Sequence, residues 1–481
     1  MLVSRRQFMG VSAVTGGVVL TGTAFGRLGA AAENDGWPAL PPVKIHVVYV
    51  GLGGAWPKPE FDAPAEQAKF AAYLEGVRQR LGDVVFTGGQ LIPNSLAAAE
   101  EEAAKVGDAD AVLVVHLSFG NGDPLAAFTK TGLPVAVYSQ PFSGHDWMYA
   151  PRWRKAGLRI ILAPSSAMTE LDRLAALLRV PARMKQTKIV LVGRPQGTPD
   201  ACAADKVKEM FGCEVVPVSV EDVIAAHGAV PLPDAEAEAE SQWLSAAKKI
   251  VEPPREEIVK SARMYLAMKN LMLQHGARAI TINCLGGIPI DILGYPCLAF
   301  SRLCDSGLPG ACEADMDSTL TMLLMSYAHG LPGFITDPLF DTARNGMIHA
   351  HCVSPTRMAG PDDARAPFLI RTHRDDNKGA ALEVELKMGQ EITCAKLVHL
   401  KHMLISTGKI TEVPDFDDRG CRTQIVAEVA DARGMAKNWG SGLLDDADMM
   451  TLLHRVVFYG NHVNDMEDLG ALMGFNTVQE G

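Results

Sequence analysis

The sequence predicts an α/β protein: two doubly wound parallel-sheet domains followed by a β-rich, barrel-like C-terminal domain. The first observation behind this prediction is that short apolar strands alternate with helix-length segments up to about residue 355, a pattern typical of parallel sheets with helices on both faces. The second is a change near Pro367, after which short strands separated by turns indicate an antiparallel sheet or small barrel. We therefore expect domains at 43–184, 185–355 and 356–481, after a leader at 1–32.

The leader resembles a twin-arginine signal peptide. Ser4-Arg5-Arg6-Gln7-Phe8-Met9 is followed by a mildly apolar run, Val11 to Phe25, and by Ala30-Ala31-Ala32 as a small-residue cleavage site. The run is too short and too rich in glycine for a good transmembrane helix, so we expect export to the periplasm without membrane insertion after processing. The alternative is an N-terminus that is amphipathic or unstructured.

Charge and cysteine usage exclude several classes of protein. The formal net charge of −11 argues against nucleic acid or an anionic membrane as a partner. The nine cysteines contain no C-x-x-C pair, which argues against a zinc ribbon or a thioredoxin motif. Because the twin-arginine pathway carries folded proteins, disulfides are not required and we expect buried free thiols.

The first domain opens with a buried strand, Lys44–Val50, that ends in Gly51-Leu52-Gly53-Gly54. Trp56 and Pro57 exclude the dinucleotide-binding fingerprint at this point, because the third glycine is missing and no helix can start there. The other elements expected in this domain are helices 63–81, 95–106, 124–129 and 167–178 and strands 83–87, 109–116, 134–138 and 158–163.

The remaining elements follow from the same patterns. The central domain is expected to contain strands 188–193, 213–220 and 278–283 and helices 200–211, 220–227, 234–249 and 256–275. The C-terminal domain is expected to contain strands 368–372, 381–386, 391–400, 403–407, 409–412, 423–429 and 455–459 and helices 445–453 and 465–473.

The stretch from Cys312 to Asp341 carries the candidate chemistry. Glu313, Asp315 and Asp317 precede an apolar helix, where free backbone N–H groups favour anions. A short strand, Phe334-Ile335, then leads to Asp337. We expect Glu313 and Asp337 to converge at the end of one sheet, an arrangement that suits a hard divalent cation, general acid–base chemistry, or both. The alternatives are that the first acids only cap the helix and that Asp337 is a turn residue.

Histidines and one aromatic loop supply further candidates. His349 and His351 alternate along a strand, so only one can face a pocket, and we favour His351 over the alternative of a core histidine. His454, which precedes the strand 455–459, could instead cap a helix. Trp147 lies in an aromatic loop that suits stacking on a sugar face or an oligomer contact equally well.

Three segments together resemble the L-fucose isomerase family and, more distantly, the L-arabinose isomerases: Ala311-Cys312-Glu313-Ala314-Asp315, Phe334-Ile335-Thr336-Asp337 and His454-Arg455-Val456-Val457-Phe458-Tyr459-Gly460. Asp337 follows Glu313 by 24 residues, the spacing of that family's metal-binding carboxylates. The resemblance implies that Glu313, Asp337 and His454 bind Mn²⁺ or another divalent cation, and that Glu313 and Asp337 act as catalytic acid and base. We expect Asp315, His351 and Trp147 to bind the substrate.

What the resemblance implies is a metal-dependent aldose–ketose isomerase of carbohydrate metabolism that works through an ene-diol. It also implies a homo-oligomer, a hexamer, whose pocket is completed by a neighbouring subunit. The alternatives are a metal-dependent sugar epimerase or lyase and a non-catalytic periplasmic sugar-binding protein on an isomerase scaffold. The presence of Glu313, Asp337 and His454 together favours the enzyme. The predicted export, the shorter chain and the strand around His349-Ala350-His351-Cys352 differ from the family.

Overall fold

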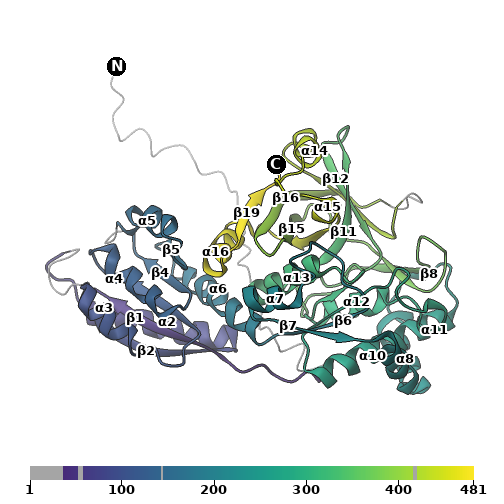
Figure 1. The fold of residues 1–481 in the computed structure, drawn as a ribbon, viewed down its shortest axis with the longest axis horizontal. Coiled ribbons are helices and arrows are strands. Elements are labelled where there is room, and N and C mark those ends of the chain that lie inside the picture. Colours follow the sequence, from purple (N-terminus) through teal and green to yellow (C-terminus); the bar gives the residue numbers. More distant parts are fainter. Residues whose placement is uncertain (1–35, 52–57, 142–144, 415–419) are drawn as a thin grey trace, which may run out of the picture.

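The computed structural model describes residues 36–51, 58–141, 145–414 and 420–481 (Figure 1). The predicted leader at 1–32 lies outside the described residues. Within those ranges, no helix has both the length and the apolar character needed to cross a membrane. The predicted fold class is confirmed, with parallel-sheet α/β domains and a C-terminal antiparallel barrel.

The first domain has a five-stranded parallel sheet in the order β2-β1-β3-β4-β5. Its elements are β1 (Val43–Val50), α2 (Ala63–Leu81), β2 (Val84–Ile92), α3 (Leu96–Ala103), β3 (Ala111–His116), α4 (Gly122–Ala126), η1 (Ala127–Thr131), β4 (Val135–Ser139), η2 (Asp146–Met148), α5 (Ala150–Lys155), β5 (Ile160–Pro164) and α6 (Glu170–Lys185). Val43, Ile45 and Val47 of β1 belong to one apolar core, whereas Val48 and Val50 belong to another. The sheet therefore buries both faces, as the near-continuous apolar strands predict.

The central domain has a four-stranded parallel sheet in the order β10-β9-β6-β7. Its elements are β6 (Lys188–Val192), α7 (Ala204–Phe211), β7 (Glu214–Val218), α8 (Val220–Ala229), α9 (Leu232–Ala239), η3 (Glu240–Leu244), α10 (Arg255–His275), β9 (Ala279–Ile282), α11 (Ile290–Leu293), α12 (Cys297–Asp305), β10 (Gly310–Ala311) and α13 (Met316–His329). The prediction of one helix over 234–249 was wrong. Helix α9 ends at Ala239, and a π-helical turn follows over Glu240–Leu244. β8 (Lys249–Ile250) then pairs with β13 (Phe368–Arg371).

The barrel contains six antiparallel strands in the order β15-β18-β11-β12-β17-β16, and pairing of β16 with β15 closes it. Its strands are β11 (Phe334–Asp341), β12 (Gly346–His351), β15 (Glu391–Val398), β16 (His402–Glu412), β17 (Thr423–Glu428) and β18 (Arg455–Tyr459). The remaining C-terminal elements are β14 (Ala381–Val384), which pairs with β13, then α14 (Ala432–Gly440), α15 (Met449–Leu452), α16 (Val463–Met473) and β19 (Asn476–Gln479).

Two expectations about these strands need correction. We placed Asp337 and His351 in the central α/β domain, but their strands, β11 and β12, pair with each other and belong to the barrel. The local pattern could not reveal this, because β11 gains its other neighbour, β18, from more than a hundred residues later. The strands expected at 403–407 and 409–412 are one strand, β16, which runs through Gly408.

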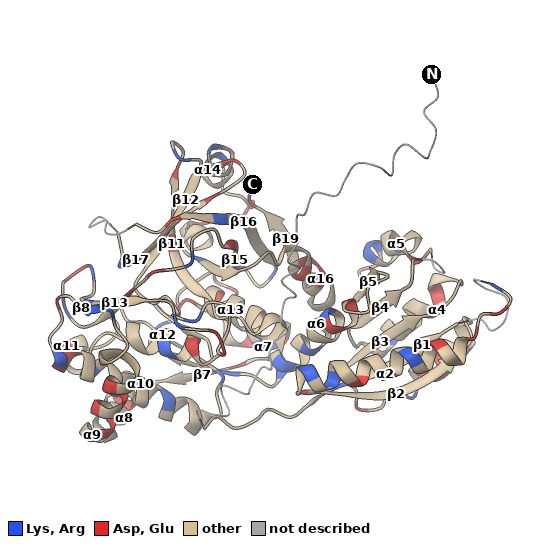
Figure 2. Cartoon of the chain, turned by 180° about the vertical axis from the view of Figure 1, so that it is seen from behind, with Lys and Arg blue, Asp and Glu red and all other residues tan. Residues whose placement is uncertain are grey.

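Three helices connect the parts of the molecule. Helix α13 packs against β9 of the central sheet and against β15 and β18 of the barrel. It also packs against α6, where the buried Arg179 pairs with Asp83 and donates to the carbonyl of Tyr327. Helix α16 lies between the barrel and the first domain, against α6 and β5 (Figure 1). Acidic and basic residues are interspersed on the outer helices, with acids frequent on α8 and α9 (Figure 2).

Candidate active site

The site begins at the tight turn that precedes α13. Glu313 and Ala314 have φ values of 61° and 53°, in the left-handed region that costs non-glycine residues conformational energy. Asp315 ends the turn as the N-cap of α13, and its side chain accepts a hydrogen bond from the Ser318 backbone N–H at 2.9 Å. The capping role that the sequence left as an alternative therefore applies to Asp315, while the turn leaves the side chain of Glu313 23 % exposed.

His454 comes from the barrel and meets both candidate ligands. Strands β11 and β18 are antiparallel, with Ile335 opposite Val456 and Thr336 opposite Arg455, so the next position sets Asp337 against His454. The Nε2 atom of His454 lies 3.4 Å from Oδ1 of Asp337 and 3.6 Å from Oε2 of Glu313. The structure thus brings together the three residues that the sequence proposed as metal ligands, although His454 lies far from the carboxylates in the chain.

The orientation of His454 leaves one ring nitrogen available. Its Nδ1 lies 2.9 Å from Oδ2 of Asp315, so Nδ1–H donates to this carboxylate. The other nitrogen, Nε2, is buried, has no hydrogen-bond partner and faces the carboxylates of Glu313 and Asp337. An unpaired buried acceptor beside two acids is costly, whereas a cation on Nε2 would satisfy it. Ligand atoms of Asp337, His351 and His454 all lie within 4.8 Å of one another, and so do those of Cys312, Glu313 and His351. These residues therefore fit a divalent cation with mixed oxygen and nitrogen ligands.

Lys396 supports this arrangement, and the sequence reasoning missed it. It is fully buried in β15, and its Nζ lies 3.8 Å from Oδ2 of Asp315 and 3.9 Å from Oδ2 of Asp317. Its ammonium also donates to the carbonyls of Met450, at 2.7 Å, and Leu453, just before His454. Lys396 therefore fixes both the segment leading to His454 and the carboxylate behind it. A lysine within the apolar strand 391–398 was the signal that could have found it.

Asp317 completes the buried network without touching His454. Its carboxylate accepts hydrogen bonds from the backbone N–H of Thr198, at 2.6 Å, and from the Thr198 hydroxyl, at 2.7 Å. Burial and the neighbouring Asp315 raise the pKa of Asp317 to about 7, against the opposing effect of Lys396. Burial alone would also raise the pKa of Asp315, but Lys396 and His454 hold it well below its usual range. Asp315 is thus the ionised partner that orients the histidine.

Alternation along β12 does not separate His351 from His349, because residues two apart in a strand share one face; their different partners separate them. The Nε2 atom of His351 lies 3.4 Å from Oε1 of Glu313, and its Nδ1 accepts from the backbone N–H of Cys352 at 2.9 Å. Nε2 therefore carries the proton and points at Glu313. His349 is buried further along β12, between the hydroxyl of Thr336 and the thiol of Cys394. Burial would raise the pKa of Glu313, but His351 and His454 lower it, so this carboxylate is ionised at neutral pH.

Two predicted substrate contacts are placed differently. Asp315 is 1 % exposed and lies behind His454, so it positions the histidine and does not face a substrate. Trp147 lies on η2 of the first domain, 61 % exposed. Within the described part of the chain, no hydrogen bond, ion pair or ring contact links it to Glu313 or Asp337. Asp337 is not a turn residue, since it lies within β11 with its side chain 42 % exposed.

Comparison with known proteins adds relatives to this geometry. No protein-family model matches the chain. It is similar to sulfoquinovose isomerases from two organisms. The protein from Alkalicoccus urumqiensis is 22 % identical over 335 residues, which cover 63 % of this chain and 73 % of that protein. The protein from Clostridium sp. (strain MSTE9) is 24 % identical over 172 residues, which cover 34 % of this chain and 37 % of that protein. The resemblance inferred from the sequence is thus supported at the level of sugar isomerases, and the L-fucose isomerase family itself stays a prediction.

Proposed function

We propose that the chain is a metal-dependent aldose–ketose isomerase that interconverts an open-chain sugar through an ene-diol. The observation that carries the proposal is the buried, unpartnered Nε2 of His454, held between the ionisable side chains of Glu313 and Asp337. The similarity to sulfoquinovose isomerases supports the same reaction class. Glu313, Asp337 and His454 would hold a cation such as Mn²⁺, which supplies polarisation of the sugar carbonyl and orientation of its oxygens.

The chain's own residues supply the proton transfer. Isomerisation moves one proton between C1 and C2 and one between the two oxygens, so it needs an acid and a base near adjacent carbons. Asp337 and Glu313 are the exposed carboxylates of the site, with side chains 42 % and 23 % accessible, and both can reach a bound substrate. His351 directs its Nε2–H at Glu313 and would share the proton that this carboxylate accepts or releases. Asp315 and Lys396 hold His454 in place behind them.

The test combines metal analysis with a substrate screen. The purified protein, freed of metal by chelation, is supplied with Mn²⁺ and offered aldoses and ketoses, including sulfoquinovose, with interconversion followed by NMR. We expect conversion only with the metal present, with solvent deuterium entering at the carbon next to the carbonyl wherever the base exchanges its proton with solvent before returning it. Glu313→Gln combined with Asp337→Asn should abolish conversion.

The same experiment separates the alternatives. A binding protein would hold a sugar without converting it. An epimerase would convert the sugar into its epimer, and a lyase would release a dehydrated product. Any of these results, or full conversion by the metal-free protein, would overturn the proposal. We further propose that the chain acts as a homo-oligomer, a hexamer, and is exported through the twin-arginine pathway, which fits a protein loaded with its metal while folded in the cytoplasm.

A further inference from the structure

A second cluster of ligand-type side chains lies away from the site described above. His329 is the last residue of α13, His462 immediately precedes α16, and Asp465 lies in the first turn of α16. Both histidines are buried, with 5 % and 2 % of their surface exposed, and the side chain of Asp465 is 15 % exposed. Their rings lie 4.2 Å apart between centroids. None of the three belongs to the proposed isomerase machinery, so their convergence calls for a separate explanation.

The distances in this cluster match those around a small cation. Oδ2 of Asp465 lies 3.4 Å from Nε2 of His329 and 3.8 Å from Nδ1 of His462. One nitrogen from each ring and this oxygen all lie within 4.8 Å of one another. Ligands at the usual 2.0–2.2 Å from tetrahedral zinc are separated by about 3.3–3.6 Å. Only a small contraction would therefore bring the three atoms onto one ion.

The hydrogen bonds around the cluster prepare its members to act as ligands. Nε2 of His462 donates to the carbonyl of Tyr459 at 2.8 Å, because a carbonyl can only accept. With its proton on Nε2, the ring presents a bare Nδ1, which is buried and without a hydrogen-bond partner. Asp465 keeps Oδ2 toward the histidines while its Oδ1 lies 3.4 Å from Arg173. Metal-binding histidines typically donate their other N–H to a carbonyl, and metal-binding carboxylates are typically held by hydrogen bonds of their own.

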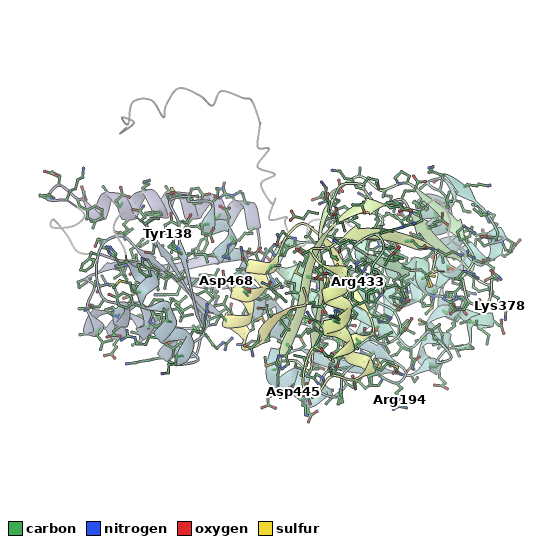
Figure 3. The ribbon with its side chains drawn as sticks, turned by 90° about the horizontal axis from the view of Figure 1, so that it is seen from above. Tyr138, Arg194, Lys378, Arg433, Asp445 and Asp468 are labelled. Atoms are coloured by element: carbon green, nitrogen blue, oxygen red, sulfur yellow. The ribbon has the colours of Figure 1, made fainter. Side chains whose placement is uncertain are left out.

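The surrounding charge is also suitable for a cation. Arg173 of α6 pairs with Glu170, Asp465 and Asp468, so one positive group faces three carboxylates. The nearby Arg179 pairs with Asp83, which also pairs with Arg183. Asp468 lies on α16 at the junction of the first domain with the rest of the molecule (Figure 3). A cation held by the histidines would add positive charge beside the three carboxylates that share Arg173.

We propose that His329, His462 and Asp465 form a second metal site, one that takes zinc with two nitrogens, one carboxylate oxygen and a water. The site ties the end of α13 to the start of α16 and, through Asp465 and Arg173, to α6 of the first domain. Its role is structural, because it holds together helices of three parts of the chain and lies outside the carboxylate pair of the isomerase site. The proposal does not depend on the proposed activity.

The test uses the full chain with the first site disabled. In a protein carrying Glu313→Gln and Asp337→Asn, stripped of metal and then dialysed against limiting Zn²⁺, we expect one zinc per chain by elemental analysis. Adding His462→Gln should remove that zinc, as should Asp465→Asn as an independent variant. His227→Gln is the matched control, since His227 is another buried histidine with an unpartnered Nε2 on α8 and should leave the zinc in place.

Stability supplies a readout apart from activity. Chelation should lower the thermal unfolding midpoint of the doubly substituted chain and leave unchanged that of the same chain with His462→Gln. Absence of zinc from the doubly substituted chain would overturn the proposal, as would zinc retained in both the His462→Gln and Asp465→Asn variants. In that case the cluster is a buried ion pair between histidine and carboxylate.

Discussion

Asp315→Asn should weaken metal binding at the proposed metal site without removing any of its proposed ligands. The carboxylate of Asp315 accepts the Nδ1–H of His454 at 2.9 Å, which sets the ring so that Nε2 faces Glu313 and Asp337. The asparagine keeps the shape and a carbonyl oxygen that can cap α13, but it loses the negative charge and can turn an N–H toward the ring. Loss of a carboxylate behind a metal-bound histidine typically costs 10–100-fold in affinity, or about 1.4–2.8 kcal/mol. We expect a loss of that size for Mn²⁺.

Asp317→Asn is the matched control for this change. Asp317 lies two positions further along the chain and nearly the same distance from Lys396, yet it bonds to Thr198 and not to His454. Isothermal titration of the metal-free proteins with Mn²⁺ should show an affinity close to that of the unsubstituted chain for Asp317→Asn and a clear loss for Asp315→Asn. Equal affinities for the two variants, with both folded by circular dichroism, would refute the orienting role of Asp315.

Further outcomes follow from the same contacts. His454→Ala should lose Mn²⁺ binding at this site while far-ultraviolet circular dichroism stays unchanged, and a variant that binds normally would contradict its role as ligand. Lys396→Met leaves two buried carboxylates without their cation and should lower the free energy of unfolding in urea by about 3–5 kcal/mol; a loss below about 1 kcal/mol would show that the ion pairs contribute little. Burial and Arg455 lower the pKa of His349 to about 3 from 6.5, so only the unfolded chain takes up this proton as the pH falls through that window. His349 thus lowers the free energy of unfolding by about 1.4 kcal/mol for each pH unit below pH 6.5. His349→Gln should therefore flatten the dependence of the urea midpoint on pH between about pH 6.5 and 4, and the same dependence in the variant and the unsubstituted chain would contradict this prediction. Light scattering should give the mass of a hexamer, and an active monomer would refute that assembly.

Much of the fold could be predicted because its signals are local. The buried strands of the first two domains are continuous apolar runs bounded by turns, and each needs only its own residues to be recognised. The acids before α13 were found in the same way, since an N-cap and the following apolar helix are adjacent in the chain. The helix expected at 234–249 failed because α9 ends at Ala239, a π-helical turn follows over Glu240–Leu244, and Lys249 already pairs with a strand more than a hundred residues away.

The sequence by itself indicated the acids before a helix and after a strand as a candidate cation site, and its resemblance to a sugar isomerase family added the histidine before a C-terminal strand. Only the tertiary structure decided how they meet. Antiparallel pairing of β11 with β18 sets Asp337 against His454, and this pairing depends on closure of a barrel from strands spread over more than a hundred residues. The same closure buries Lys396 against Asp315 and converts an apparent substrate ligand into the partner of His454. Such contacts have no local pattern, because a buried charge is stabilised by whichever distant groups the fold brings to it.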